Sequence, residues 1–241
     1  MAEVEQSRTQ LAQNEAARLP QMRLVVVGGH TRSIGKTTLV CEIVAALPQA
    51  GWIAGKITQY GHGVCAQNGH DCDCAPEEHI CAIEWETLRD SGTDSARFLA
   101  AGARKSFWLR TKQGYLAEGL PLLRTALAEV EPLPPVEPLN VIIESNSLLQ
   151  FLKPNLYVAV LDPSKADFKD SARQMLDRAH VYVFRRGLED SEISAPVWTM
   201  VPERFLREKP SFLQREGEPL PEPLFQLVKR LMETPLSVHE R

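Results

Sequence analysis

The stretch MRLVVVGGHTRSIGKTTLV constrains this chain more than any other, because it combines three patterns in a fixed order. Residues 22–29 form a continuous apolar run that ends in two glycines, as a strand buried on both faces of a parallel sheet does. Residues 36–47 place their apolar positions on one helical face, and Pro48 ends that pattern. Between the two lies a short loop containing glycine, lysine and threonine. The stretch therefore predicts a strand, a loop and a helix in direct succession.

The loop differs by one residue from the standard phosphate-binding pattern G-x4-G-K-[ST], which would need glycine in place of His30. Counted from Gly29, it reads G-x5-G-K-T-T. Such loops turn backbone N–H groups onto phosphates, while the lysine neutralises charge and the following hydroxyl reaches Mg²⁺. The alternative is an ordinary strand-turn-helix, which we disfavour because all three parts stand in order. We therefore predict nucleotide contacts from Gly29, His30, Thr31, Arg32, Ser33, Ile34, Gly35, Lys36, Thr37 and Thr38, with Thr37 also binding Mg²⁺.

Further apolar runs alternate with helical patterns along the rest of the chain, which predicts an α/β fold with a mainly parallel, doubly wound sheet of about seven strands. The helical patterns cover residues 115–130, 165–178 and 224–232. We expect an N-terminal leader over residues 1–21 and one domain over residues 22–241, with an insert at 60–83 that fits no sheet layer. The further strands are expected at residues 52–57, 105–110, 140–144, 156–161, 180–184 and 197–201.

Phosphoryl chemistry needs an acidic residue at the end of a strand near the loop, to orient water or Mg²⁺. Glu144 directly follows the apolar residues 140–143, at the edge where α/β sheets bind ligands. We therefore assign catalytic roles to Lys36 and Glu144. Asp162, after residues 156–161, is the alternative acid, although Asp162-Pro163-Ser164 also makes a good turn.

The loop GGHTRSIGKTT resembles that of dethiobiotin synthetase and related cofactor-biosynthesis enzymes, whose G-T-D-T-x-V-G-K-T has the same longer spacing. Residues 22–147 also resemble the accessory GTPase of molybdopterin-guanine dinucleotide synthesis. The matching pieces after the loop are Lys56 at a strand end, Gly92-Thr93-Asp94-Ser95, Ala101-Gly102-Ala103 and Glu144.

These resemblances imply a P-loop NTPase in which Lys56 also contacts the nucleotide, and a homodimer like many members of this class. Two departures limit them. Ser145 replaces the glycine that usually follows the glutamate, and residues 185–187 read Arg-Arg-Gly, without an Asn-Lys-x-Asp string to read guanine. GTP preference therefore does not carry over, and we favour ATP over GTP.

Four of the five cysteines form the pattern C-x6-C-x-C-x6-C between residues 65 and 81. Four thiolates within 17 residues suit Zn²⁺ or an iron–sulfur cluster. Structural zinc sites usually contain C-x2-4-C pairs, which this pattern lacks, so we favour an iron–sulfur cluster over zinc, with a redox-active disulfide as a third alternative. The predicted ligands are Cys65, Cys72, Cys74 and Cys81, with His62, His70 and His79 as substitutes or neighbours.

The formal charge of −4 and the lack of Lys/Arg clusters argue against nucleic acid as a partner. No segment has the apolar length of a membrane span or a signal peptide, so we expect a cytoplasmic protein that does not bind membranes. The patterns together favour a nucleotide hydrolase or transferase with a cysteine-bound metal centre, acting in metallocofactor assembly or metal delivery with a client metalloprotein or cofactor-synthesis enzyme. Two alternatives stay open: an ATP-dependent small-molecule kinase or ligase with a zinc-stabilised lid, and a non-enzymatic, nucleotide-gated redox or metal sensor.

Overall fold

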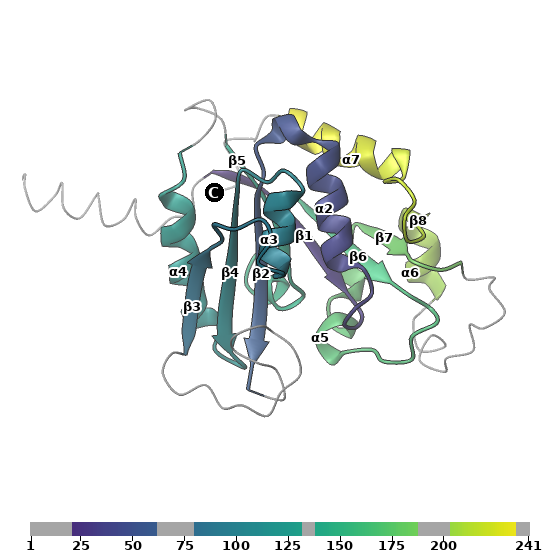
Figure 1. Ribbon diagram of the computed structural model, residues 1–241. Helices are drawn as coiled ribbons and strands as arrows, with labels where there is room; N and C mark the ends of the chain where they lie inside the picture. The colour runs from purple at the N-terminus through teal and green to yellow at the C-terminus, as the bar shows by residue number, and fades with distance from the viewer. Residues whose placement is uncertain (1–20, 62–79, 132–137, 188–202, 235–241) are drawn as a thin grey trace, which may run out of the picture.

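One eight-stranded sheet forms the centre of an α/β fold in the computed structural model, which describes residues 21–61, 80–131, 138–187 and 203–234 (Figure 1). All neighbouring strands are parallel except β3 and β4, which are antiparallel. The predicted fold class is therefore confirmed, with eight strands in place of about seven. The strands are β1 (Met22–Gly29), β2 (Ile53–Tyr60), β3 (Cys81–Trp85), β4 (Lys105–Lys112), β5 (Leu139–Glu144), β6 (Leu156–Leu161), β7 (Val181–Phe184) and β8 (Ser211–Leu213).

The strand order across the sheet is β3-β4-β2-β5-β1-β6-β7-β8, which places β1 between β5 and β6. After β1 the chain moves to the β2 side of the sheet, and after β5 it crosses to the β6 side. Ligands of open parallel sheets bind outside the carboxyl ends of the strands, at such a point of reversal. The topology thus puts the loop after β1 at the most favourable position for a ligand site.

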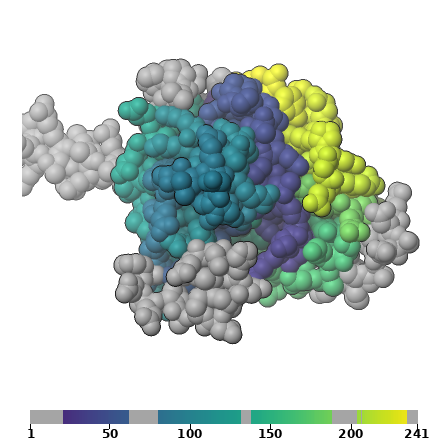
Figure 2. Space-filling model, viewed as in Figure 1, coloured from purple at the N-terminus to yellow at the C-terminus, as the bar shows by residue number. Residues whose placement is uncertain are grey.

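Helices cover both faces of the sheet, because alternate residues of β1 point into two separate cores. Val25 and Val27 pack on the face covered by α2 (Lys36–Ala46), α3 (Asp94–Ala100) and α7 (Glu222–Glu233). Leu24 and Val26 pack on the opposite face, against α4 (Leu116–Ala128), α5 (Asp170–Arg173) and α6 (Glu203–Glu208). Figure 2 shows α7, in yellow, lying beside α2 on the first of these faces.

Six of the predicted apolar runs form the strands β1, β2, β4, β5, β6 and β7, whereas residues 197–201 lie outside the described residues. The sequence prediction missed β3 and β8. β8 has only three residues, too few for a periodic pattern. β3 overlaps the end of the segment 60–83, which was expected to fit no sheet layer; that expectation is wrong for residue 60, in β2, and for residues 81–83, in β3.

The segment 60–83 begins and ends in strands: Tyr60 closes β2, and Cys81 opens β3 at the edge of the sheet. Its interior, residues 62–79, lies outside the described residues, as do the predicted leader residues 1–20.

The helix predicted over residues 165–178 is wrong, because only the short α5 and a 3-10 turn at Leu176–Arg178 form there. Asp162 accepts hydrogen bonds from the backbone N–H (3.0 Å) and hydroxyl (2.6 Å) of Ser164, which makes a turn directly after β6. Residues 165–169 then run without helical structure, and Lys169 donates its backbone N–H to the carbonyl of His30 at 2.8 Å. Contacts with the phosphate loop thus override the local helical pattern.

The described helices include none that is both long and apolar enough to cross a membrane.

Candidate functional site

The loop between β1 and α2 turns through two residues with positive φ, Ser33 at 50° and Gly35 at 86°. Gly35 is the N-cap of α2, and no side chain caps that helix. Among the described residues, no hydrogen-bond acceptor engages the backbone N–H groups of residues 33–38. Six amides at the start of a helix, supported by its positive dipole end, form an anion-binding site. The loop therefore has the geometry to hold phosphate.

Asn146 fixes the start of the loop, a role that the sequence analysis missed. Its amide oxygen accepts from the N–H of Gly29 at 2.8 Å, and its amide nitrogen donates to the carbonyl of Gly29 at 2.7 Å. A Cβ at Gly28 would lie 2.3 Å from that amide oxygen, so only glycine fits there. The contact joins residues 117 positions apart, so no local pattern could have revealed it.

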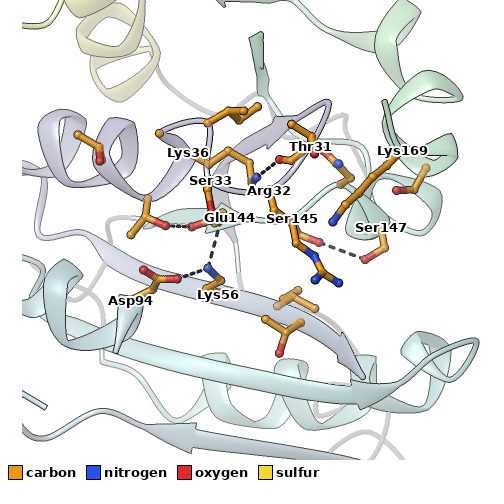
Figure 3. A pocket seen from close by; sticks show the side chains of 18 of the residues that line it. Thr31, Arg32, Ser33, Lys36, Lys56, Asp94, Glu144, Ser145, Ser147 and Lys169 are labelled. Carbon is orange, nitrogen blue, oxygen red and sulfur yellow. Dashed lines mark hydrogen bonds and ion pairs between the residues drawn. The ribbon is translucent and has the colours of Figure 1, made fainter. Parts of the chain in front are cut away.

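The Lys36 side chain folds back over the loop, and its Nζ donates to the carbonyl of Thr31 at 2.6 Å (Figure 3). Burial lowers the pKa of Lys36 to about 8, and the charge of Glu144 only partly opposes that shift. The ammonium group is thus held where an anion bound to the loop amides would relieve its loss of hydration.

Glu144 lies beside α2 and connects the loop to β2. Its Oε2 accepts from the hydroxyl of Thr37 at 2.6 Å, while its Oε1 lies 3.3 Å from Nζ of Lys56. Lys56 also pairs with Asp94 at the start of α3. Burial would lower the pKa of Lys56, but Glu144 and Asp94 raise it above its usual value. Figure 3 shows these groups forming one chain of contacts across the cleft.

Arg97, in α3, extends this chain to Thr38 in the first turn of α2. Its guanidinium lies 3.5 Å from Asp94 and donates to the hydroxyl of Thr38 at 3.3 Å. The short segment Gly92–Ser95, singled out in the sequence only by resemblance, therefore lies against the phosphate loop.

His30, which occupies the place of the standard first glycine, points into the protein and is fully buried. Its Nδ1 accepts from the backbone N–H of Asp162 at 3.4 Å, and its ring packs 5.1 Å from that of Phe168. Burial lowers the pKa of His30 to about 4. The imidazole thus supports the loop from beneath, so the sequence prediction of a nucleotide contact finds no side-chain counterpart here.

The other predicted loop residues differ in how far their side chains are exposed to solvent. Ile34 is buried in the core under α2, while Arg32 and Ser33 are exposed in the cleft. Thr31 donates its hydroxyl to Asp167, which ties the loop to the segment after β6.

Arg185, at the end of β7, braces the opposite side of the loop and was also missed as a site residue. Its Nη2 donates to the carbonyl of Gly35 at 2.7 Å, and its Nη1 donates to the side chain of Gln214 at 2.9 Å. Gln214 in turn donates to Glu42 of α2 at 2.8 Å. This network holds the left-handed turn at Gly35 and the first turns of α2 in place.

One cleft of about 1610 Å³ at the carboxyl edge of the sheet brings most of the polar groups together: it is lined by Lys36, Thr37, Lys56, Asp94, Arg97, Glu144, Asn146 and Arg185. That volume exceeds the 300–1,000 Å³ typical of a single small-molecule site. Eight of its lining residues are Lys or Arg and five are Asp or Glu, although the chain as a whole carries a charge of −4. The cleft therefore concentrates positive charge and attracts anions.

Of the four predicted cysteine ligands, Cys81 lies among the described residues. Cys65, Cys72 and Cys74 lie outside them, as do His62, His70 and His79. Cys81 is a half-buried free thiol whose Sγ donates to the carbonyl of Glu118 at 3.6 Å. In the described part of the chain, no group of three or more His, Cys, Asp and Glu side chains is placed to hold a metal ion. Cys41 packs against the core of α2, and burial raises its pKa to about 11.

No protein-family model matches the chain, and no curated protein matches its sequence. Solved structures similar to it include LpxK from Aquifex aeolicus in complex with ATP (15% identity, TM-score 0.45), a Zn(II)-bound triple mutant of the YjiA GTPase (15%, 0.40) and HypB from Helicobacter pylori in complex with nickel (13%, 0.43). The matches cover 88%, 86% and 99% of this chain, and 60%, 61% and 99% of the respective structures. The chain thus spans about three fifths of the length of the first two.

These likenesses assign neither a family nor an activity to the chain, because identity and TM-score are low in all three. The class rests on the chain's own geometry: an α/β protein in which a strand, a loop and a helix at the reversal point of the sheet form a turn with the geometry to hold phosphate.

Proposed function

We propose that this protein binds a nucleoside triphosphate in the cleft, transfers or hydrolyses its terminal phosphoryl group, and serves metallocofactor assembly or metal delivery. The observation that carries the nucleotide part is the row of backbone amides over residues 33–38, which engage no acceptor among the described residues. An anion with several oxygens satisfies such a row, and a polyphosphate does so best.

Each side chain of the site has a role in this proposal. Lys36 and the loop amides hold the phosphates. The hydroxyl of Thr37 and the carboxylate of Glu144 are hard oxygen donors of the kind that Mg²⁺ prefers, and they lie 2.6 Å apart. When bound, Mg²⁺ would neutralise charge on the phosphates. Glu144 orients the attacking group, and Lys56, 3.3 Å from its Oε1, holds the carboxylate in place.

We favour ATP as the nucleotide. The residues after β7 are Arg185 and Arg186, and Arg185 is already committed to the carbonyl of Gly35 and to Gln214. A guanine-reading Asn-Lys-x-Asp string is missing from the sequence at this position. Competition between ATP and GTP for the same site measures the preference directly.

The metal part of the proposal rests on the cysteine pattern and on where the segment 60–83 joins the sheet. Tyr60 ends β2 opposite Lys112, and Cys81 begins β3 opposite Thr111. The segment therefore leaves and rejoins the sheet at the carboxyl edge, the same edge as the phosphate loop. A centre held by Cys65, Cys72, Cys74 and Cys81 would belong to that edge, so we propose that nucleotide and metal influence one another. An iron–sulfur cluster remains our preferred centre.

The first test is the content of iron, zinc and acid-labile sulfide, with a visible spectrum, in protein purified without oxygen. We expect iron and sulfide in matching amounts, lost in the double variant Cys72→Ser, Cys74→Ser. Zinc without sulfide would overturn the iron–sulfur assignment. In the same samples, binding of Mg²⁺ with ATP to the parent protein and to Lys36→Ala tests the nucleotide site, and equal affinities would contradict it.

The volume of the cleft favours a second candidate, an ATP-dependent kinase or ligase that acts on a small molecule. Thr58, Gln59 and Gln113 line the cleft beyond the phosphate loop, at the ends of β2 and β4. This polar extension provides room for an acceptor. Product analysis with candidate acids, amines and alcohols distinguishes transfer from hydrolysis, and sedimentation of the same samples tests the expected homodimer.

A further inference from the structure

The turn between β3 and α3, residues 86–93, is built around a carboxylate that lies outside the cleft. Glu86 directly follows β3, and its backbone N–H donates to the carbonyl of Ser106 on β4 at 2.8 Å. The end of the sheet therefore fixes the backbone of Glu86, while its side chain gathers donors from the turn. Oε1 accepts from the backbone N–H groups of Thr87 (3.1 Å) and Leu88 (3.0 Å), and Oε2 accepts from the hydroxyls of Ser91 (3.1 Å), Thr93 (2.7 Å) and Ser95 (3.0 Å).

These donors make the carboxylate of Glu86 a strong constraint on the shape of the turn. Loss of hydration alone would raise the pKa of Glu86, but the hydrogen bonds from Thr93, Leu88, Ser95 and Ser91 lower it below its usual value. The group is therefore ionised at neutral pH. Hydrogen bonds to an ionised acceptor are roughly twice as strong as those between neutral groups.

Thr93 transmits this constraint to α3, because it is the N-cap of that helix. Its hydroxyl donates to Glu86 and accepts from the backbone N–H of Ala96 at 3.1 Å. A hydroxyl has a single proton, so donation to Glu86 leaves its lone pairs free for the helix. At the other end of α3, Arg89 of the same turn donates to the carbonyl of Leu99. The turn thus fixes where α3 begins and how it lies.

Asp94, the first residue of α3, connects this arrangement to the site. It pairs with Lys56, whose Nζ lies 3.3 Å from Oε1 of Glu144 (Figure 3). Arg97 also lies near Asp94, at 3.5 Å, but it belongs to the same helix and moves with it. Arg97 therefore cannot fix Asp94 relative to Lys56, whereas Glu86, which is hydrogen-bonded to the sheet, can.

We propose that Glu86 is a positioning residue for the phosphoryl chemistry: it holds Asp94 against Lys56, and through Lys56 it fixes the carboxylate of Glu144. This inference rests on the proposed function. Glu86 lies outside the cleft, and Lys36 and the loop amides hold the nucleotide without it. Loss of Glu86 should therefore slow turnover and leave nucleotide affinity nearly unchanged.

The test compares three variants of the full chain. In Glu86→Ala, we expect the kcat for phosphate release from ATP with Mg²⁺ to fall about tenfold, because a small misplacement of a catalytic group is costly. The Kd of a non-hydrolysable ATP analogue should change less than about threefold. Glu86→Gln keeps an oxygen for the two N–H groups and an amide that can donate to the hydroxyls, so it should retain at least half of the parent kcat. Asp90→Ala is the matched control, since it removes an exposed charge from the same turn and should leave both values unchanged.

Asp94→Ala tests the route of the effect. If Glu86 acts through Asp94, adding Glu86→Ala to this variant should lower kcat by less than a further twofold. A second measurement needs no nucleotide: the rate at which acetic anhydride modifies Lys56, followed by mass spectrometry. We expect this rate to rise at least threefold in Glu86→Ala and in Asp94→Ala, because the ammonium loses a partner, and to stay near the parent value in Glu86→Gln.

Thermal unfolding of each variant checks that the fold is retained. Should Glu86→Ala fail to fold, Thr93→Val removes the shortest of the five contacts and should change kcat and Lys56 modification in the same direction. Three results would overturn the inference: parent-like kcat and Lys56 modification in Glu86→Ala, an undiminished effect of Glu86→Ala on kcat in the Asp94→Ala background, or equal losses of kcat in Glu86→Gln and Glu86→Ala. If the parent protein turns over no ATP but Lys56 modification responds as expected, the proposed function fails while the link from Glu86 to Lys56 stands.

Discussion

The two flanks of β1 hold the same loop by different means. On the β5 side, Asn146 is hydrogen-bonded to Gly29, and a separate polar chain leads from Thr37 through Glu144 to the ion pairs of Lys56. On the β6 side, the buried ring of His30 packs on Phe168. The polar flank thus carries the groups suited to phosphoryl chemistry, while the packed flank fixes the shape of the loop. Substitutions on the two flanks should therefore affect different measurements.

The largest effect is expected from Lys36→Ala, because Lys36 is the cation that reaches over the loop. We expect the Kd for Mg²⁺ with ATP to rise at least 100-fold, or about 3 kcal/mol, as for loss of a charged hydrogen bond to an anion. Calorimetry or a fluorescent nucleotide measures it. The free energy of unfolding in urea should stay close to that of the parent protein. A large loss of stability would show that Lys36 acts mainly by fixing the loop's shape, as His30 does.

His30 should control stability in acid rather than binding. Its pKa is about 4 in the folded protein and about 6.5 in the unfolded chain, so the unfolded chain takes up the proton first as pH falls. Stability should therefore decrease between about pH 6.5 and 4, by about 3 kcal/mol from this group.

Urea unfolding across that pH range tests the contribution of His30. The variant His30→Asn keeps an acceptor for Asp162 but does not titrate, so it should lose less stability over the same interval, although it starts lower because the ring contact with Phe168 is gone. Equal pH slopes for the two proteins would refute the assignment.

Asn146→Ala tests a structural contact that lies on the polar flank. Removing both hydrogen bonds to Gly29 should cost about 2 kcal/mol of unfolding free energy. Asn146→Asp retains an acceptor for the N–H of Gly29 but sets a carboxylate oxygen against the carbonyl of Gly29, so its loss should be at least as large. Identical stability of Asn146→Ala and the parent protein would contradict this role.

The pH dependence of nucleotide binding tests the environment of Lys36. Its pKa of about 8 in the free protein must rise when an anion binds beside it. Affinity should thus be level below about pH 8 and fall about tenfold per unit above it. Lys36→Arg stays charged throughout and should show no such decline, whatever its absolute affinity.

The smallest effect is expected from Arg97→Ala. Half of the Arg97 side chain is exposed, so its pairing with Asp94 and Thr38 is screened by solvent. We expect less than about 1 kcal/mol in unfolding free energy and a change in nucleotide Kd of a few-fold at most. A loss as large as that of Lys36→Ala would show that the polar chain acts as one unit.

The sequence predicted the features that depend on local pattern: six strands, the loop after β1 and the helix that follows this loop. It also predicted that Glu144 lies near the loop, because the carboxyl ends of parallel strands share one edge of the sheet. The sequence did not predict the contacts that depend on register between distant segments. Asn146 meets Gly29 only because β5 pairs with β1, and Arg185 meets Gly35 only because β7 lies two strands from β1. The helix predicted over residues 165–178 is wrong for the same reason. The backbone N–H of Lys169 donates to the carbonyl of the distant residue His30 instead of to a carbonyl within a helix.

The brace formed by Arg185, Gln214 and Glu42 has a consequence for the order in which the protein matures. Gly35 and Arg185 are 150 residues apart, and Glu42 and Gln214 are 172 apart. A nascent chain emerging from the ribosome presents the phosphate loop long before it presents the residues that hold the loop's left-handed turn. We therefore expect the proposed nucleotide site to form only when synthesis is nearly complete. Truncated chains that end before Gln214 should carry the whole loop sequence and yet fail to bind nucleotide.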